Sequence, residues 1–371
     1  MQSSARVRVV VALFTASRAI WAQSPSPSFA ALSTEAQTAR DAHQLEKAVD
    51  LYKKALKLKP NWEDGLWSLG SMAYDLNQYR DCIWAFGKLL DLKPDSTPGW
   101  TMAGLCEYEL YNYGLALDDF TQAEQLGFNE NIELARTGRL HFALALTRTG
   151  NFENAVSILT ELARTDRTTT PEMIVAAGIA GLRRPWLPPE VPEAQRDLVY
   201  RLGDAMISGA RKNLQEAGDK FGELVKAYPS EPEIHFRYGS WLSSAGDNRG
   251  IDELKKAVAL APNHVPTLVG LSALSLNRGD AKTAVEYGEE AVKASPEDFA
   301  THLILGRALL ASEEPARAAT ELEQAVKLAP NSAQAHYNLA EAYNHLGKKT
   351  DAVREQAEFK RLEHPGGKQI P

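Results

Sequence analysis

The chain has 371 residues, of which 44% are apolar and 24% charged, and its net charge at neutral pH is −7. This composition excludes a disordered protein, because there is ample apolar surface to bury, and the acidic balance gives no electrostatic case for binding nucleic acid. Two cysteines are too few for a disulfide-stapled scaffold or a cysteine-rich zinc site, and no apolar run reaches the roughly 18 residues of a transmembrane helix.

The first residues have the order of an export signal. Two arginines precede the apolar run Val9–Phe14, and no acidic residue occurs before Glu35. This order predicts a secretory signal peptide over residues 1–22, cleaved near Ala22, with residues 23–28 as a short linker. An organellar transit peptide and an unstructured N-terminal tail are the alternatives.

A repeat of 34 residues runs through the rest of the chain. Prolines recur at this interval, at Pro60 and Pro94 and again at Pro262, Pro296 and Pro330. Small residues stand twelve positions earlier, at Ala48, Cys82, Gly250, Ala284 and Ala318. Mostly large apolar residues stand eight positions earlier, at Tyr52, Phe86, Leu254, Gly288 and Leu322. Small residues let two helices pack closely, large ones fill the gaps, and proline ends the second helix.

This pattern resembles the tetratricopeptide repeat, in which aromatic, Leu-Gly, Ala and Pro positions recur in this order. Two clear matches are Leu69-Gly70 with Phe86 and Pro94, and Leu305-Gly306 with Ala318, Ala325 and Pro330. Nine units are expected, starting near Phe29, Glu63, Thr97, Arg136, Leu198, Glu231, Val265, Phe299 and Ala333. The resemblance implies an all-α fold, a right-handed superhelical solenoid of helix-turn-helix repeats.

The repeat is interrupted near its middle. We expect an N-terminal array of about four repeats over 29–163 and a C-terminal array of about five over 198–364, followed by a tail, 365–371. Between the arrays, 164–197 is predicted to be an irregular Pro-rich insert, since its four closely spaced prolines cannot continue a helix. The insert is either a plain connector or a segment that bends the superhelix and presents a docking surface.

Motifs for chemistry are absent from the sequence. There is no His-Glu-x-x-His, no Cys/His set at zinc spacing, no phosphate loop and no nucleophile elbow, so we expect no enzyme, no metal and no cofactor. His302 and His336 share one repeat slot, which favours packing roles. Cys82 and Cys106 lie on helices expected to be neighbours, so they form either a disulfide or two buried free thiols.

The resemblance implies that the first helix of each unit lines a concave groove. The residues predicted to bind in it are Trp67, Tyr74, Asp75, Tyr108, Glu109 and Tyr111. Aromatic side chains anchor peptides, and the carboxylates would favour a basic or apolar partner. The alternative for Trp67 and Tyr74 is packing on adjoining helices. The Lys/Asn/Arg clamp of chaperone-binding relatives is missing, so binding to chaperone tails is not expected.

These observations together predict a non-enzymatic scaffold or adaptor that binds a protein or peptide. Its expected location is the periplasm, with a role in envelope assembly or secretion. A cytoplasmic or organellar complex-assembly adaptor is the alternative, and a catalytic role at the 164–197 insert is a third. The partner and the oligomeric state cannot be read from the sequence.

Overall fold

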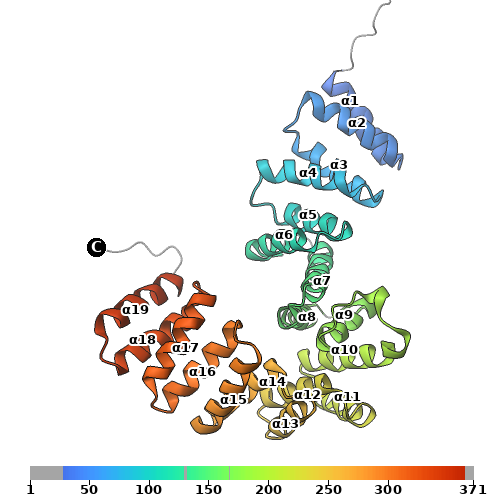
Figure 1. Ribbon diagram of the computed structural model, residues 1–371. Helices are drawn as coiled ribbons and strands as arrows, with labels where there is room; N and C mark the ends of the chain where they lie inside the picture. Colours follow the sequence, from blue (N-terminus) through green and yellow to red (C-terminus); the bar gives the residue numbers. More distant parts are fainter. Residues whose placement is uncertain (1–27, 129–131, 167, 364–371) are drawn as a thin grey trace, which may run out of the picture. The chain divides into compact units, whose positions relative to one another are not determined.

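The computed structural model describes residues 28–128, 132–166 and 168–363. The predicted signal peptide, almost all of the linker and the tail lie outside these residues. Within them the chain is all-α, as predicted: it forms nineteen α-helices and two short 3-10 turns, and no strand (Figure 1). None of the described helices is long and apolar enough to cross a membrane.

The helices divide into two compact units, one up to Asp95 and the other from Ser96. The first unit holds two consecutive pairs: α1 (Phe29–Asp41) with α2 (Leu45–Leu58), and α3 (Glu63–Asp75) with α4 (Tyr79–Leu92). The division into arrays over 29–163 and 198–364 stays a prediction.

The second unit continues with helices packed pairwise in chain order. The pairs are α5 (Thr97–Glu109) with α6 (Tyr113–Leu126), α7 (Ile132–Arg148) with α8 (Phe152–Thr165), α10 (Arg196–Ala210) with α11 (Leu214–Ala227), α12 (Pro232–Ser244) with α13 (Arg249–Leu260), α14 (Val265–Asn277) with α15 (Ala281–Ala294), α16 (Phe299–Ala311) with α17 (Pro315–Leu328), and α18 (Ala333–His345) with α19 (Lys349–Glu363). Six of the nine units begin at the predicted residue, and the other three begin within four residues of it.

The repeat slots form the cores of the pairs. Ala48, Cys82, Ala284 and Ala318 are fully buried on the second helices, and Tyr52, Phe86 and Leu322 fill the space beside them. Each pair turns through one residue with a positive φ, the left-handed region that costs a side chain about 1 kcal/mol or more. These residues recur at the repeat spacing and include His43, Asn77, Tyr111, Lys212 and Glu313, with glycine in four other turns.

The predicted insert is irregular only in part. Its apolar stretch forms a helix, α9 (Pro171–Gly181), which ends in a turn where Arg183 has a φ of 54°, as at the end of a first repeat helix. Prolines then exclude a second helix and leave only two 3-10 turns, η1 (Pro188–Glu190) and η2 (Glu193–Gln195). The helix α9 therefore resembles half a repeat, and α10 packs against it.

Backbone contact holds this half-repeat in place. A Cβ atom at Gly178 would lie 1.8 Å from the carbonyl oxygen of Val199, and one at Gly203 would lie 1.9 Å from that of Ile174. The helices α9 and α10 thus touch at a crossing that admits no side chain. Trp186, which follows the helix, packs on the apolar core that these two helices share.

Candidate functional site

Three of the predicted groove residues lie on α3 in the first unit. The half-buried ring of Trp67 meets the buried ring of Phe86 edge to face, with centroids 5.3 Å apart. Tyr74 makes a similar contact with Tyr79 at 5.8 Å, and Asp75 is exposed. Much of the Trp67 surface therefore serves packing inside this unit.

The other three predicted groove residues lie at the end of α5 in the second unit. Tyr108 is half-buried between Tyr113 and His141, with ring centroids 5.5 and 4.9 Å away, and burial raises the pKa of its hydroxyl. Glu109 is half-buried, whereas Tyr111 stands in the following turn with 75% of its surface exposed. Only Tyr111 among the three presents a largely free ring. That all six residues bind a partner stays a prediction.

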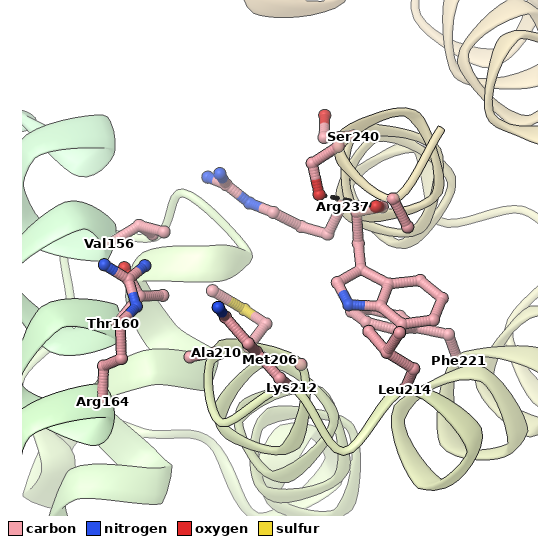
Figure 2. A pocket seen from close by; sticks show the side chains of 14 residues that line it. Val156, Thr160, Arg164, Met206, Ala210, Lys212, Leu214, Phe221, Arg237 and Ser240 are labelled. Carbon is pink, nitrogen blue, oxygen red and sulfur yellow. Dashed lines mark hydrogen bonds between the residues drawn. The ribbon is translucent and has the colours of Figure 1, made fainter. Parts of the chain in front are cut away.

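A cavity that the sequence analysis did not predict lies in the second unit, next to the half-repeat. It encloses about 700 Å³ and is lined by four helices, α8, α10, α11 and α12. Figure 2 shows Val156 and Thr160 on one side, Met206 and Ala210 on another, and Leu214 and Phe221 opposite. Its size is typical of pockets that take a small molecule or one large side chain with its flanking backbone.

The half-buried indole of Trp241 forms part of the apolar wall. Its ring lies against Phe221 and Tyr238, with centroids 5.7 and 6.1 Å away. A Cβ atom at Gly209 would lie only 2.7 Å from the indole nitrogen, so the indole edge rests on bare backbone of α10. Trp241 is therefore held in place by its neighbours while one part of it faces the cavity.

Three cationic side chains border the same cavity, and their charges are compensated to different degrees. Arg237 is buried and fully engaged: it donates to both carboxylate oxygens of Glu153, at 2.8 and 3.0 Å, and to the carbonyl oxygen of Gly181 at 3.0 Å. Arg164 pairs with Glu161 of its own helix, where both side chains are about half exposed. Lys212 is exposed and has no ion pair among the described residues.

The Arg237 pair also joins distant parts of the chain. Glu153 accepts a second arginine, Arg183, at 2.6 Å, so one carboxylate ties α8 to the end of α9 and to α12. Burial alone would raise the pKa of Glu153, but the charges and hydrogen bonds of Arg237 and Arg183 lower it overall. Ion pairs therefore hold the helices around the cavity together. We call Glu153 with Arg183 and Arg237 the ionic frame.

The comparisons with known proteins identify the repeat. Residues 303–359, which span most of α16 to α19, match the tetratricopeptide repeat family. This segment of the chain is therefore tetratricopeptide repeat. No curated protein sequence matches the chain.

Among solved structures, the chain is similar to MamA proteins. MamA from Desulfovibrio magneticus RS-1, residues 41 to the end, is 22% identical over 45% of this chain and 96% of its own, with a TM-score of 0.42. MamA from strain AMB-1 is 19% identical over 44% of this chain and 98% of its own, with a TM-score of 0.40.

The histidines of the C-terminal repeats have packing roles, in agreement with their shared slot. In His302, one ring nitrogen lies 2.6 Å from Glu321 and the other 2.8 Å from the carbonyl oxygen of Pro296. His336 makes the same two contacts with Glu355 and Pro330. No group of three or more potential metal ligands occurs among the described residues.

The structure decides between the two states that the sequence allowed for the cysteines. Cys82 and Cys106 are both buried, and each is disulfide-bonded. The alternative of two free thiols is therefore wrong.

The cavity escaped the sequence analysis because its residues occupy ordinary repeat slots. Trp241 stands in the slot that Ser275, Leu309 and Tyr343 fill in the next three units, at steps of 34 residues. The indole of Trp241 is larger than these three side chains, and its size was the one signal in the sequence that pointed to the cavity. The residue in a single slot does not indicate that the repeat is interrupted after α8, where these helix surfaces lack a regular neighbour.

Proposed function

We propose that this tetratricopeptide repeat protein is a non-enzymatic scaffold that binds a segment of another protein in the cavity between α8, α10, α11 and α12. One observation supports the proposal above all: a pocket of about 700 Å³ with an anchored, half-buried tryptophan opens where the repeat is interrupted. Half-buried aromatic residues at the rim of a cavity are favoured anchors for protein partners. Repeat arrays present extended binding surfaces, which fits this role.

We also propose that the protein acts after export, in envelope assembly or secretion. The order of basic, apolar and small residues before Gln23 supports export. The two disulfide-bonded cysteines support it independently, because disulfides persist in oxidising compartments. The alternative, a cytoplasmic or organellar adaptor, would keep the N-terminus or cut it elsewhere. Intact mass of the protein purified from its source distinguishes them: export predicts a chain that begins at Gln23.

Site-specific photo-crosslinking tests the binding role. Benzoylphenylalanine replaces Leu214, which lines the cavity and is 55% exposed, and in a second variant it replaces Tyr111, which is 75% exposed. We expect ultraviolet light to attach a discrete protein to position 214. A product from position 111 alone would favour the groove predicted from the sequence. The absence of any protein product from both positions, with the fold intact by circular dichroism, would contradict the scaffold function.

A further inference from the structure

The cavity is basic in an acidic protein. The chain has 41 lysines and arginines against 48 acidic residues. The described residues that line the cavity nevertheless include Arg164, Lys212 and Arg237 and no aspartate or glutamate. Figure 2 shows these three cations reaching the space from α8, from the turn after α10 and from α12. A low-dielectric cleft lined by one sign of charge concentrates ligands of the opposite sign.

Two of these cations are available to a ligand. Arg237 is saturated by Glu153 and by the carbonyl oxygen of Gly181. Lys212 has no ion pair among the described residues, and Arg164 has only its exposed pair with Glu161. Exposed pairs of this kind are worth less than about 1 kcal/mol, so a ligand carboxylate can replace Glu161 at little cost. The positive charge that a ligand can reach therefore lies at Arg164 and Lys212.

The rest of the lining is mostly apolar. It includes Met206, Leu214 and Phe221 together with Trp241. The indole N–H has no acceptor among the described residues, so it too can donate to a ligand oxygen. A small inorganic anion would leave this apolar surface unused. The lining therefore fits a ligand that carries carboxylates beside a large apolar side chain.

A second cavity adjoins the first. It encloses about 450 Å³ and shares Leu214, Trp241 and Ala245 with the first. Its remaining lining is mostly polar and includes Gln215, Asp219, Tyr238, Asp247 and Arg249. Two adjoining cavities separated by a tryptophan suit an extended chain, whose backbone polar groups need partners along its length.

We propose that these adjoining cavities bind an acidic, extended protein segment, which inserts a large apolar side chain beside Met206 and Trp241 and pairs its carboxylates with Arg164 and Lys212. This proposal rests on the scaffold function and names the chemistry of its partner. It differs from the sequence-based expectation of a basic partner, which was drawn from Asp75 and Glu109 in a different region of the chain.

Selection from a library of random peptides displayed on phage tests the proposal with the full chain as target. We expect the native protein to select peptides that combine Asp or Glu with Phe, Leu or Trp. The double variant Arg164→Glu/Lys212→Glu should bind these peptides at least about tenfold more weakly, since it removes two charge-assisted contacts and places carboxylates where they repel an acidic peptide. Trp241→Ala should lower the apolar enrichment and keep the acidic one.

A matched variant controls for net charge. Lys282→Glu/Lys293→Glu on α15 changes two exposed cations outside the cavities, lowers the net charge by the same amount as the double variant, and should leave the selected peptides and their affinity unchanged. Circular dichroism and thermal unfolding establish that each variant folds. Selected peptides without acidic enrichment, or equal affinity for the double variant, would overturn the proposal. So would complete displacement of the peptides by millimolar inorganic phosphate, which would indicate a small-anion site. If crosslinking at Leu214 still captures a protein in that case, the scaffold function survives and only the acidic specificity fails.

Discussion

Different kinds of contact hold the helices together at the junction around α9 and in the C-terminal repeats α14 to α19. In α16 to α19, a histidine on the first helix of each pair meets a glutamate 19 residues later on the second, in His302 and in His336. His235 on α12 makes the same kind of contact with Glu253 on α13. At the junction, Arg237 reaches back 84 residues to Glu153, and α9 crosses α10 at two glycines. The first kind of contact is local and periodic, whereas the second is long-range and occurs once.

This difference explains where the cavity lies. A regular repeat covers the surface of the preceding repeat, because each pair packs on the next. The half-repeat α9 lacks a second helix, so surfaces of α8, α10 and α12 around Thr160 and Ser240 are left to line a space. Binding surface is thus created by an interruption, and its stability depends on contacts that no neighbouring repeat duplicates.

The largest expected effect comes from the glycine crossing. Gly203→Ala places a Cβ atom 1.9 Å from the carbonyl oxygen of Ile174, where backbone and not a flexible side chain must move. We expect a loss of about 3 kcal/mol or more in the free energy of unfolding, measured by urea denaturation. Gly270→Ala in α14 is the matched control, because nothing lies within 4 Å of its added atom. It should be neutral or stabilising by up to about 1 kcal/mol. Equal effects of the two substitutions would contradict the backbone crossing.

The ionic frame should give the second largest effect. Glu153→Ala leaves the buried guanidinium of Arg237 without its carboxylate, and we expect about 2 kcal/mol of destabilisation, since one side of Glu153 remains exposed. Glu161→Ala, on the same helix, removes only an exposed pair and should change stability by less than about 0.5 kcal/mol. A double-mutant cycle with Arg237→Ala isolates the coupling, and strict additivity would show that the pair does not stabilise the junction.

The repeats could be predicted from the sequence because each of their contacts is local. A proline, an alanine and a large residue at fixed spacing suffice to place α16 and α17, whose slots Ala318 and Leu322 are fully buried. The junction could not be predicted from the sequence, since nothing in the spacing of Glu153 and Arg237 indicates that they meet. The groove assignment failed to find the cavity for a related reason: aromatic rings such as Trp67 and Trp241 occur in repeat slots whether or not they border a space.

The same ionic frame predicts a loss of stability in acid. The folded pKa of Glu153 is depressed below its unfolded value, so its contribution is present above the unfolded pKa, near 4.3, and is lost as the pH falls through the folded pKa. We expect native protein to lose more stability between pH 6 and pH 3 than the Glu153→Ala/Arg237→Ala variant, measured by urea denaturation at each pH. If the free energy of unfolding falls equally with pH in the two proteins, groups other than Glu153 determine the loss of stability in acid.

A repeat contact should have a smaller and more local effect. His302→Ala removes hydrogen bonds to Glu321 and to the carbonyl oxygen of Pro296, and we expect a loss of about 1–2 kcal/mol. Because repeat arrays transmit stability mainly to nearest neighbours, hydrogen exchange should accelerate in α16 and α17 and their adjoining pairs, and stay unchanged in α9 and α10. Faster exchange throughout the second unit would contradict the local character of this contact.

One substitution should have opposite signs in the two regions. Glu313 and Arg183 both end a helix with a φ near 55–60°, where glycine avoids the strain of a side chain. Glu313 is exposed and has no ion pair among the described residues, so Glu313→Gly should stabilise by about 0.5–1 kcal/mol. Arg183 instead donates to Glu153 and lies 5.1 Å from the centre of the Phe152 ring. The lost contacts outweigh the relief, so Arg183→Gly should destabilise by about 1 kcal/mol. Stabilisation by both changes would mean that Arg183, like Glu313, serves only the turn, and that its pair with Glu153 does not stabilise the contact between α8 and the end of α9.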